Sequence, residues 1–182
     1  MKKIQNLVSE LLERNNIYEP PVPVKRIAKS LGLTIRAYDL GSGVSGALLL
    51  DQEKAVIGIN PNESTERTRF TVAHETGHFC LHKTSTALFV DRDVLFRGGE
   101  FDGTKVLFRD GNSSSGEIKV EREANAFAAE LLMPIRMLVK EINSLKLEQF
   151  SHDEDIINAL AKKFQVSSVA MTYRLTNLGL LK

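Results

Sequence analysis

Three of the four histidines in the chain lie within nine residues of one another, at positions 74, 78 and 82. The first two belong to the segment His74-Glu75-Thr76-Gly77-His78, whose His-Glu-x-x-His spacing acts as a unit only on a helix. Residues four apart on a helix project about 40° from each other, so both imidazoles can bind one Zn²⁺ ion. Glu75 is turned about 100° from His74, where it can accept a proton from an activated water. The motif therefore predicts a zinc-binding helix that ends near His82.

The alternative interpretation is a solvated helix with two surface histidines. The helical wheel argues against it, because the histidines lie along the edge of an apolar stripe. This stripe consists of Phe70, Ala73, Gly77, Cys80 and Leu81. Gly77 in mid-helix costs about 1 kcal/mol relative to Ala, so we expect another element to pack closely against it.

A zinc site for catalysis needs a third protein ligand, and a carboxylate is the natural candidate. A second helix is predicted over 119–133, before Pro134, with an apolar stripe of Ala124, Phe127, Ala128, Leu131 and Leu132. Glu121 lies on the edge of the stripe, whereas Glu123 and Glu130 lie on the more solvated side. We therefore predict Glu121 as the third ligand and keep Glu123 as the alternative. Asn125 is expected to form a hydrogen bond with a ligand histidine, although a capping or surface role for Glu121 stays open.

The remaining candidates are interpreted more simply. His82 is expected to be a pocket or surface residue, because a third ligand from the same helix would strain the geometry. His152 lies in the polar stretch 151–155, where it either stabilises an oxyanion across the cleft or lies on the surface at the start of a helix. Cys80 is expected in the core.

The rest of the chain predicts an α+β fold. Helical patterns cover 1–15 and 23–31, and three short apolar runs predict a small antiparallel sheet from strands 33–38, 46–50 and 55–59. The glycine-rich segment 88–119 is interpreted as a mobile insertion, with a hairpin around Val106–Phe108. Further helices are expected to about 142, over 155–164 and over 167–178. We therefore expect a catalytic domain over 1–150 and a helix-turn-helix-like element over 151–182.

Charge and cysteine content limit the possible partners and compartments. The net charge is +1, and the C-terminal element is almost neutral, which does not favour direct DNA binding or membrane binding. The single cysteine excludes an intramolecular disulfide, and residues 1–19 carry no signal-peptide pattern. These features predict a cytoplasmic protein; they give no indication of its oligomeric state.

Two segments together resemble the ImmA/IrrE-type zinc metallopeptidases. They are Val72-Ala73-His74-Glu75-Thr76-Gly77-His78 and Glu121-x-x-Ala124-Asn125-x-Phe127-Ala128-x-x-Leu131-Leu132-Met133-Pro134. The resemblance covers nearly the whole chain and is weakest over 88–119. It implies a compact gluzincin-like fold, with His74, His78 and Glu121 on zinc and Glu75 as the base. It also implies a helix-turn-helix repressor as the substrate, whose cleavage derepresses mobile-element or stress genes.

Two other functions remain as alternatives. The first is a DNA-binding regulator in which zinc is only structural, but such a site is expected to have four protein ligands, and only three are found. The second is a partner protein that sequesters a repressor without cutting it.

Overall fold

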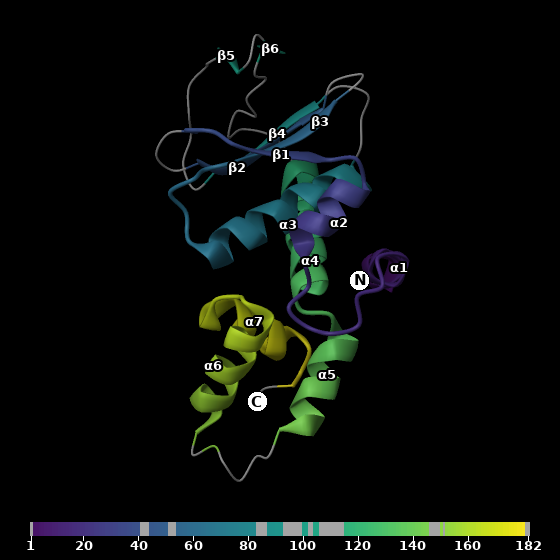
Figure 1. Ribbon diagram of the computed structural model, residues 1–182, viewed down its shortest axis with the longest axis vertical. Coiled ribbons are helices and arrows are strands. Elements are labelled where there is room, and N and C mark those ends of the chain that lie inside the picture. Colours follow the sequence, from purple (N-terminus) through teal and green to yellow (C-terminus); the bar gives the residue numbers. More distant parts are fainter. Residues whose placement is uncertain are drawn as a thin grey trace.

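The molecule is built in three layers along its longest axis. The computed structural model describes residues 2–40, 44–50, 54–82, 87–92, 100–101, 104–105, 115–145, 150 and 152–180. A β-sheet lies at one end, and α3 (Thr65–Leu81) and α4 (Ser115–Leu132) lie beneath it (Figure 1). The opposite end is formed by α5 (Ile135–Ser144), α6 (Asp153–Phe164) and α7 (Ser168–Asn177). The predicted mixture of helices and a small sheet is confirmed.

The sheet is mixed, so the prediction of an antiparallel sheet is wrong. Its strands are β1 (Thr34–Ala37), β2 (Val44–Leu50), β3 (Ala55–Ile59) and β4 (Ala87–Arg92), in the order β1-β3-β2-β4. Strand β2 is antiparallel to β3 and β4, but β1 is parallel to β3. The reason is topological. Strands β1, β2 and β3 alternate in direction along the chain, so β1 and β3 run the same way, and they are neighbours because β3 lies between β1 and β2.

The segment predicted as an insertion over 88–119 contributes ordered elements at both of its ends. Strand β4 pairs with β2, and α4 begins at Ser115. Between them, β5 (Glu100–Phe101) and β6 (Thr104–Lys105) form a short antiparallel pair. The hairpin expected around Val106–Phe108 lies outside the described residues.

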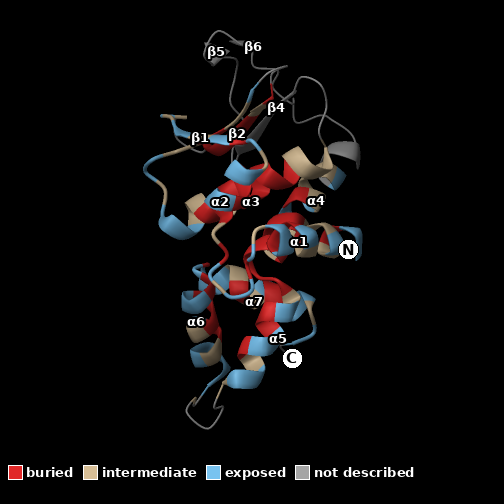
Figure 2. Ribbon diagram, turned by 45° about the vertical axis from the view of Figure 1, so that its right-hand side comes forward, coloured by how far each residue is buried: buried red, intermediate tan, exposed pale blue. Residues whose placement is uncertain are grey.

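The hydrophobic core extends through all of these layers. Helix α1 (Lys2–Arg14) buries one apolar face, and α2 (Val24–Ser30) packs against α3. Figure 2 shows buried positions concentrated on α3, α4 and the inward faces of the C-terminal helices. Leu160, Phe164, Met171 and Leu175 of α6 and α7 belong to the same apolar cluster as the N-terminal elements. No helix among the described residues is both long and apolar enough to cross a membrane.

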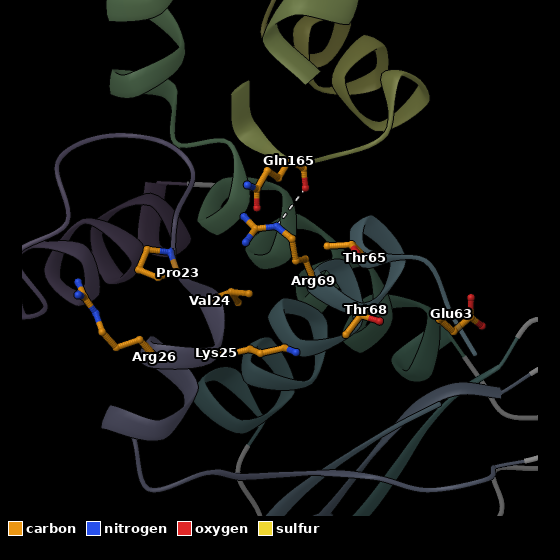
Figure 3. Close-up of a pocket in the computed structure, with 9 residues that line it drawn as sticks. All are labelled: Pro23, Val24, Lys25, Arg26, Glu63, Thr65, Thr68, Arg69 and Gln165. Atoms are coloured by element: carbon orange, nitrogen blue, oxygen red, sulfur yellow. Dashed lines mark hydrogen bonds between the residues drawn. The ribbon is translucent and has the colours of Figure 1, made fainter. Parts of the chain in front are cut away.

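Arg69 of α3 joins the N-terminal segments to the C-terminal helices. Its guanidinium donates from Nε to the Gln165 carbonyl at 3.0 Å and from Nη2 to the Val22 carbonyl at 3.0 Å (Figure 3). Nη2 also donates to the Phe164 carbonyl at 3.3 Å. One buried cation therefore holds the turn between α6 and α7 against α3.

A second contact fixes α7 to α4 through a buried ion pair. Arg174 donates to the Glu130 carboxylate and, from Nε, to the Met133 carbonyl at 3.1 Å. Both charged residues are buried, so the expectation that Glu130 faces solvent is wrong. A buried carboxylate is tolerated where a cation pairs with it, and Arg174 provides that cation.

The sheet packs onto α3 at a point with no room for a side chain. A Cβ atom at Gly46 of β2 would lie 2.1 Å from Thr71 Cγ2, and Thr71 is fully buried in α3. The glycine therefore lets the central strand approach the helix that carries the histidines.

We expect Gly46→Ala to lower the free energy of unfolding by about 1–3 kcal/mol, because the added methyl overlaps Thr71. Adding Thr71→Ser should recover most of this loss, because the serine lacks the overlapping methyl group. Urea unfolding of both variants measures the effect, with Thr71→Ser alone as the control. A double variant no more stable than Gly46→Ala would contradict the proposed clash.

Candidate metal centre

The centre is formed where α3 and α4 approach most closely. A Cβ atom at Gly77 would lie 3.1 Å from Phe127 Cδ1 and 3.2 Å from the Ala124 carbonyl oxygen. The close neighbour expected from this mid-helix glycine is therefore α4. The contact brings the first half of α4 beside the histidines of α3.

Three side chains from these helices converge on one point. His74 Nε2 and His78 Nε2 lie 3.0 Å apart. Glu121 Oε2 lies 3.2 Å from His74 Nε2, and its Oε1 lies 3.3 Å from His78 Nε2. Of the described residues, these three form a group whose ligand atoms all lie within 4.8 Å of one another. His74 and His78 are buried, whereas the Glu121 side chain is 43% exposed, so the carboxylate is the member of the group that faces solvent.

The spacing of these atoms fits a tetrahedral metal ion. Zn–N and Zn–O bonds of about 2.0–2.1 Å place two tetrahedral ligands about 3.3 Å apart. The observed separations of 3.0, 3.2 and 3.3 Å are close to that value. Two imidazoles and one carboxylate are also a donor set that zinc commonly takes at catalytic sites. The residues present therefore fit a divalent metal.

Asn125 orients one of the imidazoles. Its Oδ1 lies 3.0 Å from His74 Nδ1. Because an amide oxygen only accepts, this contact keeps the ring proton on Nδ1 and leaves the Nε2 lone pair facing His78 and Glu121. The structure thus places Asn125 beside the candidate ligand.

The pKa shifts of His78 and Glu121 also suit the binding of a cation. Burial lowers the pKa of the His78 ring, which keeps it neutral at neutral pH. Burial alone would raise the pKa of Glu121, but hydrogen bonds and charge from His74 and His78 outweigh it and hold that pKa well below its usual value. Neutral imidazoles and an ionised carboxylate are the forms in which these groups bind metals.

The other predicted site residues lie around this group. Glu75 is fully buried in α3, next to His74, and is not among the three converging residues. In the middle of α3, every residue from Thr71 to His78 is buried, so the buried part of the helix is wider than the apolar stripe predicted from the sequence. Three members of that stripe, Phe70, Cys80 and Leu81, are only partly buried. Cys80 packs against the core at that partly buried position.

His82, Glu123 and His152 have different surroundings. His82 Nε2 lies 2.9 Å from Glu123 Oε2, a pairing that sequence reasoning missed. The signal in the sequence that could have indicated a polar partner for His82 was its four-residue spacing from His78, which places both histidines on the same edge of the helix. His152 is exposed at the start of α6, where its backbone N–H donates to Asp155 Oδ2 at 3.2 Å. The structure does not bring it together with the three ligand candidates.

A separate pocket of about 360 Å³ lies near the start of α3 (Figure 3). It is lined by residues of α2 and the first turns of α3, together with Gln165. None of the candidate ligands lines it, so its walls do not belong to the metal centre.

Comparison with known proteins places these motifs in a wider group. Residues 28–176 match the peptidase family described as the IrrE N-terminal-like domain. The chain is 28% identical over 165 residues to Metallopeptidase ImmA of Bacillus subtilis, covering 91% of this chain and 78% of that protein. It is 31% identical over 126 residues to the Radiation response metalloprotease IrrE of Deinococcus radiodurans, covering 69% of this chain but 32% of that protein.

Two further similarities come from a phage and from a solved structure. The chain is 25% identical over 131 residues to an Uncharacterized immunity region protein 2 of Bacillus phage phi105, of which it covers 66%. A Mycobacterium tuberculosis transcriptional regulator has the same fold, with a TM-score of 0.60 over 97% of this chain and 47% of that chain. Their sequence identity is 14%, so this likeness concerns the fold alone.

The geometry predicts unequal roles for the two carboxylates of α4. Glu121→Gln should weaken zinc binding by at least tenfold, because an amide replaces the charged ligand. Glu123→Gln should change it little, because Glu123 contacts His82 rather than His74 or His78. Zinc affinity measured by competition with a chelator compares the two variants. The opposite ranking would move the third ligand to Glu123.

Proposed function

This chain belongs to the metallopeptidase family of the IrrE N-terminal-like domain, and from that premise we propose that it is a zinc-dependent endopeptidase. The proposed substrate is one protein partner, a helix-turn-helix transcriptional repressor. The observation that carries this proposal is the convergence of His74, His78 and Glu121 beside the buried Glu75. Such a site combines a place for a Lewis acid with a nearby general base.

In this mechanism the chain holds the metal and moves the proton. His74, His78 and Glu121 would bind zinc, which supplies polarisation of the peptide carbonyl and activation of water. Glu75 accepts the proton of the attacking water and delivers it to the leaving amine nitrogen. Asn125 keeps the His74 ring in the tautomer whose Nε2 is free to bind the metal. Substitution of Glu75 should therefore affect proton transfer and leave the ligand set intact.

The number of ligands favours catalysis over a purely structural metal. Structural zinc sites are normally closed by four protein ligands, whereas catalytic sites use three and keep one position open. Among the described residues, the group has three members, and Glu121 is its partly exposed side. This supports a metal that substrate can reach.

The family's names support a regulatory substrate. One relative is named an immunity region protein of a phage, and another a radiation response metalloprotease. Phage immunity and stress responses both depend on gene control, which makes a transcriptional repressor the proposed partner. Its cleavage would derepress mobile-element or stress genes. The proposed location of the protein is the cytoplasm, where a transcriptional repressor would be accessible to it.

The test uses purified zinc-loaded protein and a helix-turn-helix repressor encoded beside its gene. We expect discrete fragments with wild type and an intact repressor with Glu75→Gln, which should still bind one zinc per chain. The amide of the variant cannot accept a proton from water, so turnover should fall at least about 100-fold, in the range of general-base catalysis. Fragments are measured by mass spectrometry.

Three outcomes would redirect the proposal. Equal cleavage by Glu75→Gln would remove Glu75 as the base. An intact repressor held in a stable complex with wild type would favour sequestration. Rapid digestion of unrelated proteins such as casein would make this a general peptidase.

Recognition away from the cut bond should also be measurable. We expect kcat/KM for a short peptide spanning the cut to be at least tenfold lower than for the whole repressor, because remote contacts contribute binding energy. Parallel digests of both substrates at matched concentration measure the ratio. Equal values would show that specificity lies only around the scissile bond.

A further inference from the structure

His82 extends the column of histidines on α3 by one turn. The ring centroids of His78 and His82 are 5.5 Å apart, compared with 4.6 Å between His74 and His78. His82 is the residue directly after α3, and its backbone N–H still donates to the His78 carbonyl at 2.9 Å. Yet His82 is not one of the three converging ligands, and the proposed reaction leaves it without a role.

The ring of His82 is held by one carboxylate. Its Nε2 lies 2.9 Å from Glu123 Oε2, and only 12% of its side chain is exposed. Its Nδ1 is buried without a hydrogen-bond partner among the described residues. Glu123 also lies 4.0 Å from Lys119, whose side chain is 75% exposed, and Lys3 is near enough to lower the pKa of Glu123 by its charge. The contact with Glu123 is therefore the specific polar contact of this ring.

Glu123 and Glu121 hold α4 from two sides. Residues two apart on a helix project about 200° apart. The fully buried face of α4 lies between them and contains Ala124, Phe127, Ala128 and Leu131. Glu121 thus reaches His74 and His78 past one flank of this face, and Glu123 reaches His82 past the other. A rotation of α4 about its axis that moved Glu121 away from the histidines would also break the contact on the opposite flank.

We propose that His82 and Glu123 are a positioning pair that fixes the rotation of α4 and thereby holds Glu121 in place to bind the metal. The inference rests on the proposed metal site and adds a determinant of its affinity. Glu121 needs such support because its side chain is 43% exposed, so burial does not fix it. Asn125 contacts the His74 ring, whereas the His82–Glu123 contact acts on α4, the helix that carries Glu121.

The test compares zinc affinity and Co²⁺ absorption spectra in variants of the pair. Glu123→Ala and His82→Ala should each weaken zinc binding about tenfold, the size typical of losing support for a ligand. They should also change the visible spectrum of the Co²⁺-loaded protein. The double variant should bind zinc about as tightly as the single variant with the lower affinity, because both substitutions remove the same contact. Glu123→Gln should remain near wild type, since its amide oxygen still accepts a hydrogen bond.

Arg122→Ala is the matched control, because Arg122 is exposed on the same turn of α4. It should change neither affinity nor spectrum, and the urea midpoint of the metal-free proteins reports folding separately. Wild-type affinity in both Glu123→Ala and His82→Ala would overturn this inference alone. So would a lowered urea midpoint with unchanged affinity. A wild-type protein that takes up no metal would overturn the proposed function as well.

Discussion

The arrangement depends on how closely α3 approaches α4 at Gly77. Two candidate ligands belong to one helix and the third to the other, so the distance between the helix axes sets the size of the candidate metal site. A side chain at position 77 would press against Phe127 and the Ala124 carbonyl. Ligand atoms 3.0–3.3 Å apart leave little tolerance for such a shift. The stability lost by placing glycine inside a helix is thus offset by the contact that it allows.

Local sequence patterns predicted the helices well, because each helix carries its own periodic signal. The histidine spacing placed two side chains on one edge, and the stripe of α4 placed Glu121 near them. The strand order could not be predicted in this way, because the parallel pairing of β1 with β3 depends on which strand lies between them. Strand β4 was missed because glycine-rich sequence follows it. The burial of Glu130 was missed because its partner, Arg174, is 44 residues away in sequence.

Helix α4 is held at two places by polar contacts as well as by its apolar face. In its middle, Glu123 contacts His82, the residue directly after α3, and near its end, Glu130 contacts Arg174 of α7. The second contact makes the C-terminal helices part of the support of the ligand-bearing helix. Lys163 of α6 and Glu141 of α5 add a further ion pair within the C-terminal layer. The C-terminal helices are therefore joined to α4 by a hydrogen-bonded ion pair. Because such a contact is directional, it fixes the orientation of α4 more strictly than apolar packing does.

The contacts of Arg69 have an evolutionary consequence. Among the described residues, its three hydrogen-bond acceptors are backbone carbonyls, belonging to Val22, Phe164 and Gln165. A carbonyl is present whatever side chain the residue carries, so the exposed residues of the turn between α6 and α7 are free to diverge while the joint is kept. Arg69 itself has no such freedom, because few side chains can donate in several directions from one buried position. Related proteins that keep this arginine can therefore acquire different surfaces around the turn without losing the way their layers fit together.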